Sequence, residues 1–462
     1  MDVALVHAWK AICQELYPAF SCLSTVTLLH ICTGWVLCRS KPTVTNLICT
    51  IGDKLFGHVT KHWTVYHKFF YRAAWSVETV SRLLLTRVVL PLIDEEGDEG
   101  SDGSIELIFD GTTTGRTGKH VAFAGYFKDA SVGNTLKSVV HWAHNWIVGC
   151  VLLRPRRWPN WALSLPVTMA LYRKRADCDR KHRFVTTQQL AGRMIQRVRE
   201  TLPERQIRAC GDGQFATRDV VQALDEGSNL VSRIRGDAAL YEIPKRPRKP
   251  KRGQPRKKGK RLPAPKKLAK SRKKGWRTIQ ARKGGQVVKR RVLSIVCLWY
   301  HVCKDQPIKL VIARDPSGQE RDDFFFCTDP TVSEVEVVER YYARWTIEES
   351  IRDGKQLGGF EQVQGWGPRT VERQAPLAMF IQTLVKTWYI RWGVRATSIH
   401  SKAPDVCGWL GEKNHPSYLD MLAALRRAIW DHRINTNCGA QRRVRSILKT
   451  LRFTLCGAAK NG

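Results

Sequence analysis

Four side chains near residue 345 share a spacing that suits phosphate chemistry. Tyr341, Arg344, Glu348 and Lys355 occupy positions i, i+3, i+7 and i+14, so a helix with 3.6 residues per turn points all four to one side. A carboxylate with a phenol and two cations on its own face fits a divalent metal ion beside a phosphate backbone. The spacing therefore predicts a metal-assisted site that acts on nucleic acid.

Two aspartates upstream each close a strand-like run. Asp110 ends the run 105–110 and Asp212 ends the run 206–212. Open α/β sheets usually place their sites at the carboxyl ends of strands, and two magnesium ions roughly 3.5–4 Å apart need carboxylates from separate elements. A strand-end aspartate alone is more often a turn or cap residue. Combined with the helical spacing around Glu348, the three acids are the predicted catalytic and metal-binding set.

Charge points to a polyanionic partner. Lys and Arg outnumber Asp and Glu by 77 to 41, which leaves a net charge of +36. Such an excess opposes compaction unless an anion is the usual partner. Nucleic acid is the leading candidate, and an anionic membrane surface is the second.

The cysteines and the longest uncharged stretch indicate the compartment. None of the 14 cysteines forms a C-x-x-C pair, so no zinc site is indicated and free thiols in a reducing cytoplasm are expected. Residues 20–38 carry no Lys, Arg, Asp or Glu but hold many hydroxyl side chains. We expect a buried helix pair or helix-turn there rather than a membrane span. The start of the chain lacks the basic region of a signal peptide. A cytoplasmic, nucleoid-associated protein with no membrane partner is the prediction.

The first part of the chain, 1–93, has helical patterning. Residues 47–58 and 60–75 read as two helices broken at Gly57-His58, with Thr60 as a possible N-cap. Basic residues on the second helix suit DNA contact, and an ordinary surface helix is the alternative. We predict a helical DNA-binding domain that an acidic, Gly-rich linker, 94–103, separates from the next part.

The remainder divides by composition into four parts. Residues 104–241 alternate strand runs with helices at 187–202 and 217–224, as expected for a mixed α/β sheet. Residues 242–328 are a basic, partly β insertion: no acid stands between Glu242 and Asp305, and 23 Lys and Arg fall within 245–291. Strands are expected there over 287–303 and 307–313. Residues 329–360 carry the four-residue spacing. Residues 361–462 are helical again, with helices expected at 376–392, 417–430 and 441–455.

Together, Asp110, Asp212 and Glu348 within the pattern Y-(2)-R-(3)-E-(6)-K resemble the DDE transposases of bacterial insertion sequences, of the fourth insertion-sequence family or a close relative. The resemblance covers most of the chain. It implies a ribonuclease H-like catalytic core interrupted by the β-rich insertion, with helical N-terminal and C-terminal parts. One departure is Gly111 after Asp110, where some relatives have a second aspartate.

The resemblance also assigns roles. It makes Asp110, Asp212 and Glu348 ligands of two Mg²⁺ ions, with Mn²⁺ as a substitute. Tyr341, Arg344 and Lys355 become contacts to transposon-end DNA near the cleaved phosphate. The neighbouring Glu349 lies about 100° around the helix and is expected to be a solvated or salt-bridged acid.

Further cations extend the predicted DNA groove. Arg116 and Lys119 follow Asp110 in a Gly-containing turn, and Arg369 and Arg373 precede an apolar helix. Solvated loop cations are the alternative for these positions. Trp276 or Trp299 is a candidate for stacking a flipped base, although a packed position is more usual for tryptophan.

These observations predict a transposase. It would bind terminal inverted repeats, cleave DNA at the ends of its element, and join the 3′-hydroxyl ends to target DNA as a homodimer in the DNA-bound synaptic complex. Two alternatives remain: a metal-dependent DNA nuclease or resolvase without strand transfer, and a catalytically inactive basic DNA-binding protein. The presence of all three acids argues against inactivation.

Overall fold

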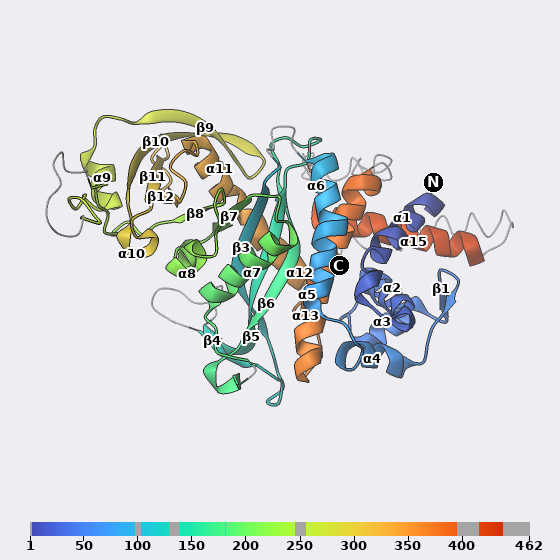
Figure 1. Ribbon diagram of the computed structural model, residues 1–462. Coiled ribbons are helices and arrows are strands. Elements are labelled where there is room, and N and C mark those ends of the chain that lie inside the picture. The colour runs from blue at the N-terminus through green and yellow to red at the C-terminus, as the bar shows by residue number, and fades with distance from the viewer. Residues whose placement is uncertain are drawn as a thin grey trace.

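A ten-stranded mixed sheet runs through one half of the molecule, and helices cover it and pack beside it (Figure 1). The computed structural model describes residues 2–97, 103–128, 139–180, 182–244, 256–394 and 415–437. This combination of a mixed sheet with flanking helices confirms the α/β class predicted from the sequence.

The sheet has the strand order β4-β5-β3-β7-β8-β12-β11-β10-β9, and β6 pairs with β5. The pairs β3–β7 and β7–β8 are parallel, and the others are antiparallel. The strands are β3 Ile105–Gly115, β4 Gly125–Lys128, β5 Val140–Leu153, β6 Leu163–Tyr172, β7 Ile207–Gly211, β8 Asn229–Arg233, β9 Arg277–Lys283, β10 Gln286–Leu298, β11 Pro307–Arg314 and β12 Asp323–Cys327. The basic stretch thus supplies strands that extend the main sheet.

The helices fall into three groups along the chain. The N-terminal group is α1 Asp2–Gln14, α2 Cys22–Leu37, α3 Val44–Ile51, α4 Trp63–Tyr71, α5 Val77–Leu83 and α6 Leu90–Glu96. The sheet region contributes α7 Thr187–Thr201, α8 Arg218–Val221, α9 Pro265–Ser271 and α10 Tyr300–Cys303. The later group is α11 Glu334–Ala343, α12 Trp345–Gln356, α13 Pro368–Trp388 and α15 Tyr418–Asn437.

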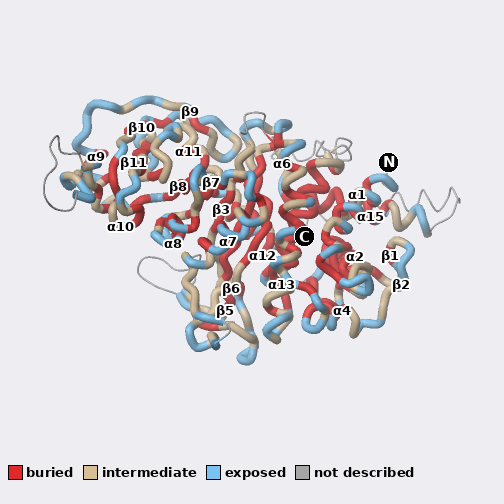
Figure 2. Tube along the Cα trace, viewed as in Figure 1, coloured by how far each residue is buried: buried red, intermediate tan, exposed pale blue. Residues whose placement is uncertain are grey.

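Helix α13 joins the two halves of the molecule. It packs against β6 on one side and against α1, α4, α5 and α15 on the other, so it lies between the sheet and the N-terminal helices (Figure 1). Nearly every residue from Gln374 to Trp388 is buried, and Figure 2 shows the core continuing from the sheet into the helical part. This continuity couples the position of the sheet to that of the helical part.

The uncharged stretch 20–38 is largely buried, as predicted, but it forms the single helix α2 rather than the expected helix pair or helix-turn. Helix α2 is buried from Thr27 to Leu37, and a helix that is apolar all round belongs in a protein core or a membrane. Within the described residues, no helix is long and apolar enough to cross a membrane. The described cysteines are free, and most of them are buried.

The predicted helix pair at 47–75 is partly wrong. Helix α3 ends at Ile51, and residues 54–59 form a small hairpin, with β1 Lys54–Leu55 paired to β2 His58–Val59. Phe56 and Gly57 both have positive φ at its tip, which is the geometry of a tight two-residue turn. The Thr60 hydroxyl donates to the Gly52 carbonyl instead of capping a helix, and α4 begins only at Trp63.

Several other boundaries differ from the sequence prediction. Strand β3 does not end at Asp110 but continues to Gly115, because β5 pairs with it along that whole length. Helix α6 runs through the start of the predicted linker to Glu96. The helix expected at 217–224 is shorter than predicted and comprises only Arg218–Val221, α8. The strand expected over 287–303 ends at Leu298 and turns into α10.

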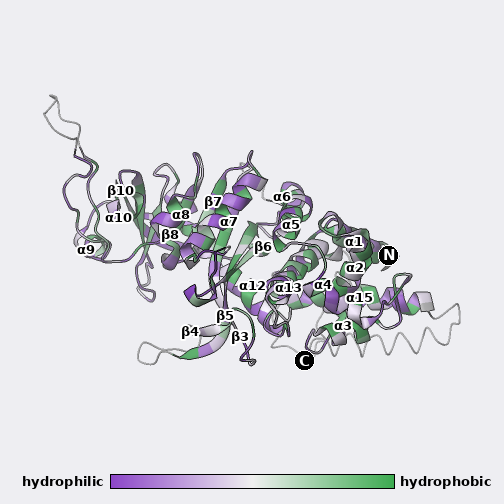
Figure 3. Ribbon diagram, turned by 60° about the horizontal axis from the view of Figure 1, so that its bottom comes forward, coloured by the Kyte–Doolittle hydropathy of each residue, from purple (hydrophilic) through white to green (hydrophobic). Residues whose placement is uncertain are grey.

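Helix α7 confirms the helix predicted at 187–202. Thr186 and Gln189 form a reciprocal capping box at its start, which satisfies two backbone N–H groups that the helix cannot pair. Figure 3 shows hydrophilic residues on α7 and hydrophobic ones along β6. The helix thus buries its apolar face on the sheet. The strand predicted at 307–313 and the helix at 417–430 are also present, whereas 441–455 and 245–255 lie outside the described residues.

Candidate active site

Parallel pairing brings the two aspartates to neighbouring strands. Phe109 on β3 is the register partner of Gly211 on β7. The next residues, Asp110 and Asp212, therefore lie beside one another on neighbouring chain segments, whose spacing is about 4.8 Å. A Cβ at Gly211 would stand 2.5 Å from the Phe109 ring. Only glycine therefore lets β7 approach β3 this closely.

Asp212 has a defined local role at the end of β7. Its Oδ1 accepts the Gln214 backbone N–H at 2.8 Å, and its carbonyl accepts the Ser232 hydroxyl at 2.8 Å. The first contact caps the short 3₁₀ turn Gly213–Phe215, as expected for an aspartate at such a position. Its second carboxylate oxygen is not used by this cap.

The segment predicted as one helix consists of two. Helix α11 ends at Ala343, and Arg344 stands at the junction with α12. Buried Arg340 anchors α11 by donating to Asn229 Oδ1 at 2.6 Å and to the Ala209 carbonyl at 3.1 Å. Helix α11 is therefore held against β8 and against β7, the strand that leads to Asp212.

Arg344 bridges two of the three predicted acids. Its Nη1 donates to Asp110 Oδ2 at 2.9 Å, and its Nη2 donates to Glu348 Oε1 at 2.6 Å. The other Asp110 oxygen accepts the Gly111 backbone N–H at 2.7 Å. A single guanidinium thus holds together the acid of β3 and the acid of α12.

The charges at this edge of the sheet are not balanced. Burial raises the pKa of Asp110 to about 6; Arg344 acts against this shift, and Asp212 and Glu348 add to it. Arg344 itself is well buried, and its Nε has no hydrogen-bond partner among the described residues. Three carboxylates beside one cation leave a net negative site in a partly desolvated place.

Tyr341 lies beneath this site. Its ring packs on Phe325 with centroids 4.5 Å apart, and the guanidinium groups of Arg233 and Arg344 lie 5.4 and 5.5 Å from it. The side chain is 7% exposed, and burial raises the pKa of its phenol to about 12. Lys355 is half-buried two turns along α12 from Glu348.

The predicted outer cations divide into two kinds. Arg116 donates to His144 Nδ1 and to the Val363 carbonyl, both at 2.9 Å, and Arg373 donates to the Phe70 and Trp75 carbonyls. Both arginines therefore tie segments of the chain together. Lys119 and Arg369 are exposed.

The donor set fits a hard divalent cation. All three acids offer carboxylate oxygens, which Mg²⁺ and Mn²⁺ prefer, and Asp212 and Glu348 add their negative charge to the burial that raises the pKa of Asp110. Among the described residues, no three His, Cys, Asp or Glu side chains gather closely enough to form a ready metal cluster. Arg344 occupies the space between Asp110 and Glu348, where a bound cation would compete with it.

A buried lysine behind the site escaped the sequence prediction. Lys386 on α13 donates to the Ser164 carbonyl at 2.8 Å and to Ser350 Oγ at 2.7 Å, which fixes α12 against β6. Burial lowers its pKa to about 8. The one available signal was a lone lysine inside the apolar run 376–392. The exposed Trp345, next to Arg344, was missed as well, whereas Trp299 is buried.

Comparison with known proteins defines the class. Residues 15–287 match the family described as DDE superfamily endonuclease. Because the match covers more than half of the chain, the protein belongs to this family. It is thus classed with metal-dependent nucleases that act on DNA. The matched residues include Asp110 and Asp212 and end before Glu348. No curated protein matches the chain.

Proposed function

We propose that this endonuclease is a DDE transposase of the fourth insertion-sequence family or a close relative. It binds the terminal inverted repeats of its element, cleaves DNA at the ends and joins the 3′-hydroxyl ends to target DNA as a homodimer. The observation that carries the proposal is the Arg344 bridge between Asp110 and Glu348. This bridge supplies the third acid beside the two that lie within the family match.

Three carboxylates have the metal-holding role in this proposal. Asp110, Asp212 and Glu348 would hold two Mg²⁺ ions, or Mn²⁺ in their place. When bound, such ions stabilise the charge that develops on the attacking and leaving oxygens of a phosphodiester. The cap contact at Asp212 orients its carboxylate toward the end of β7, and the backbone N–H of Gly111 orients Asp110.

Arg344 has a second role on DNA. Its planar guanidinium can hold a phosphate in two-point contact, and its Nε is buried without a described partner. We propose that Arg344 stands in as counter-ion while the acids are free and turns toward the scissile phosphate when DNA and metal bind. Lys355 adds a point charge about two turns past Glu348, and Tyr341 supports the guanidinium from below.

The remaining parts would serve DNA binding. In this proposal residues 1–93 contact the repeats, and 104–241 with 329–360 form a ribonuclease H-like core. The basic insertion 242–328 and the helical region 361–462 complete the DNA groove. The exposed Lys119 and Arg369 fit phosphate contact better than Arg116 and Arg373, whose donors are already used by the chain. A cytoplasmic protein associated with the nucleoid is consistent with the net charge of +36.

The test of catalysis uses three conservative variants and one control. DNA that carries the inverted repeats flanking the coding region is incubated with protein and Mg²⁺. D110N, D212N and E348Q are expected to abolish end cleavage while DNA binding remains. The control is E349Q, which neutralises the adjacent acid on α12. Normal cleavage by any of the three variants would remove that acid from the catalytic set.

The rival function is that of a nuclease without strand transfer, which the family description as an endonuclease favours. A nuclease needs its metal site, whereas a transposase must also keep the freed end docked. Pre-cut end oligonucleotides are therefore offered with a target plasmid and Mg²⁺. Wild-type protein is expected to join them, and R344A and K355A to bind them poorly and lose joining. If wild-type protein cuts ends but never joins them, the nuclease function replaces the proposed one.

A further inference from the structure

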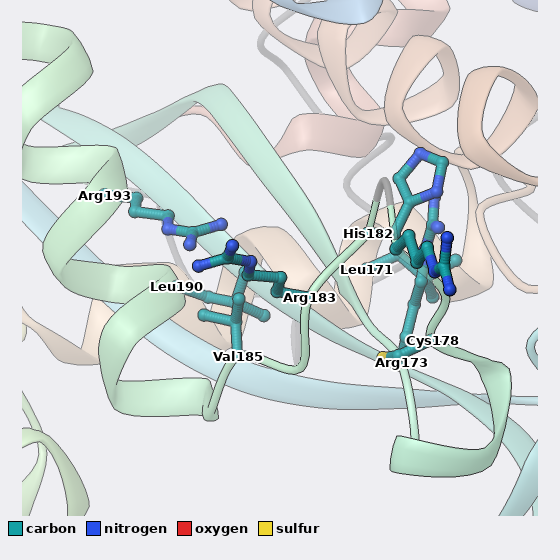
Figure 4. Close-up of a pocket in the computed structure, with 9 residues that line it drawn as sticks. Leu171, Arg173, Cys178, His182, Arg183, Val185, Leu190 and Arg193 are labelled. Carbon is teal, nitrogen blue, oxygen red and sulfur yellow. The ribbon is translucent and has the colours of Figure 1, made fainter.

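A basic pocket lies between the end of β6 and the start of α7, in the loop 173–186. It encloses about 390 Å³, and its lining includes Arg173, Arg180, His182, Arg183 and Arg193. Figure 4 shows Arg183, from the loop, and Arg193, from α7, extending toward one another across the pocket. Four arginines around one hollow form a concentrated positive charge.

Sheet topology places this pocket at the same edge as the acids. β6 runs parallel to β3, since each is antiparallel to β5, so the end of β6 and the loop after it lie at the edge that carries Asp110. Leu171, in the pocket wall, pairs in register with Trp146 on β5, and Trp146 in turn pairs with Thr112 on β3. That is two residues beyond Asp110 and about 10 Å across the sheet.

A direct contact connects the pocket to the Asp212 turn. Gln188, in the first turn of α7, donates its Nε2 to the Gln214 carbonyl at 3.3 Å. Gln214 is also the residue whose backbone N–H the Asp212 carboxylate accepts. The start of α7 therefore carries the pocket on one side and borders the Asp212 turn on the other.

The arginines of the pocket differ in whether an acid balances them. Arg173 pairs with Glu372, and Arg197, one turn further along α7 than Arg193, pairs with Glu78 at 3.3 Å. Arg183 and Arg193 are exposed and form no ion pair with a described residue. Two unbalanced guanidinium groups that face one hollow repel each other unless an anion lies between them.

We propose that this pocket, defined by Arg180, Arg183 and Arg193, binds backbone phosphates of the DNA duplex that is engaged at the acidic edge. The inference rests on the proposed function, because it takes DNA to be the substrate at that edge. Arginine suits a phosphate because its planar fork donates two parallel hydrogen bonds. The open, exposed setting of the side chains fits a long polyanion rather than an enclosed small ligand. A duplex held here is anchored about two strand spacings away from the scissile position.

The experiment measures binding without catalysis. Protein carrying D110N is titrated into a labelled duplex of unrelated sequence, without divalent metal, over a range of salt concentrations. In that background, R183Q/R193Q is expected to weaken binding and to lower the slope of log affinity against log salt by about 0.9 for each phosphate that the variant no longer binds. The control is R197Q, which matches R193Q: it removes one positive charge from the same helix, but from an arginine that Glu78 already balances.

Two further measurements make the outcome decisive. R183K/R193K keeps both charges and is expected to restore the slope, and thermal melting establishes that each variant is folded. If the double variant melts early, the single variants R183Q and R193Q carry the test. A slope and affinity equal to those of R197Q would overturn the proposal.

The result is separable from that of the proposed function. If R183Q/R193Q lowers the slope in the D110N background but wild-type protein with Mg²⁺ cuts no DNA, only the catalytic proposal is refuted. If wild-type protein cleaves normally but R183Q/R193Q leaves the slope unchanged, only the pocket proposal is refuted. Titrations with a pre-cut end duplex and with plasmid target show which DNA uses the pocket. If R183Q/R193Q binds both the end duplex and the plasmid more weakly, the pocket contacts the backbone of either DNA. If the variant binds only one of them more weakly, the pocket is assigned to that DNA.

Discussion

Arginine–carboxylate clusters occur at two places on the sheet, and they are balanced differently. At the acidic edge, Arg344 alone serves Asp110 and Glu348, with Asp212 close by. In the strands β9 to β11, four arginines, Arg277, Arg282, Arg290 and Arg314, each pair with at least one acid. Arg282 on β9 holds Glu339 of α11 at 2.8 Å, and Arg314 on β11 holds Asp322 at 2.7 Å.

The contrast is sharpest at Arg290 on β10. This side chain is 7% exposed, against 10% for that of Arg344. It donates to the Tyr342 hydroxyl at 3.0 Å and to Glu320 at 2.6 Å, and it lies 3.5 Å from Asp315. Hydrogen bonds from Ser317 and backbone N–H groups lower the pKa of Asp315 to about 2. At Asp110 the pKa moves the opposite way, to about 6.

The difference separates charges that stabilise the fold from charges to which we assign a role in binding. Buried ion pairs contribute to a fold only when each charge is matched and hydrogen-bonded. The pairs around β9 to β11 meet that condition and hold α11 in place. The acidic edge does not meet it, and an excess of carboxylates there is what a divalent cation would relieve. Removing the Asp110 charge from the acidic edge should therefore stabilise the metal-free protein, whereas removing the Arg290 charge from the other cluster should destabilise it.

The largest effect is expected for D110N. Cleavage in Mg²⁺ should fall by at least about a thousandfold, because the variant lacks one of the three proposed metal ligands. In metal-free buffer at neutral pH the same variant should be more stable than wild type, by up to about 3 kcal/mol. Folding raises the pKa of Asp110, so the ionised carboxylate lowers the free energy of unfolding above about pH 6. Below about pH 4 the carboxyl is protonated in both the folded and the unfolded protein, and this destabilisation disappears.

Chemical denaturation at several pH values tests this sign. The stability gain of D110N over wild type should be present at pH 7 and shrink as the pH falls from about 6 toward 4. A variant that is less stable than wild type at pH 7 would show that the Arg344 contact outweighs the repulsion among the acids.

R344A is expected to have the next largest effect, and in the opposite direction for stability. Removing the one cation leaves Asp110 and Glu348 without a counter-charge, which should destabilise the protein by roughly 3 kcal/mol. Added Mn²⁺ should recover part of this loss if the acids accept a metal, since a ligand that binds only the native state stabilises it. Thermal melting with and without Mn²⁺ measures both quantities, and E349Q is the control.

R290M is expected to change stability without changing chemistry. Methionine keeps much of the apolar volume of the side chain but leaves Asp315 and Glu320 without their arginine, at an expected cost of about 2 kcal/mol. Per folded molecule, cleavage of DNA ends should stay within about threefold of wild type, a shift below 1 kcal/mol in activation free energy. A large loss of cleavage at full folding would mean that this cluster also sets the geometry of the site.

The smallest effect on the fold is expected for K266Q/K267Q/K270Q on α9. These lysines are exposed, whereas Leu268 and Ala269 of the same helix are buried. The melting temperature should not change, because surface substitutions away from buried features are nearly neutral. DNA affinity should become less salt-dependent, by about 0.9 in slope for each phosphate that these lysines neutralise. An unchanged slope would mean that α9 does not touch DNA.

Most of the long elements were predictable because their patterns are local. The run of alternating and β-branched residues at 307–313 predicted β11, and the polar-apolar period of 187–202 predicted α7. The hairpin at 54–59 was missed because its turn depends on positive φ at Phe56, a conformation that no propensity assigns to phenylalanine. The prediction from sequence ended β3 at Asp110, which is too early, because the continuation of this strand depends on pairing with β5, more than 25 residues further along the chain.

The sequence alone determined which residue types were available and how they were spaced. It indicated a basic, DNA-directed α/β protein with acids at 110, 212 and 348, because side-chain periodicity and composition are local properties. Only the tertiary structure decided that Arg344 lies between Asp110 and Glu348. It also decided that Arg116 and Arg373 donate their hydrogen bonds to backbone carbonyls of the chain, and that Arg183 faces Arg193. The physical reason is that the charge state and the free donors of an arginine depend on neighbours from distant strands, which spacing along one helix cannot specify.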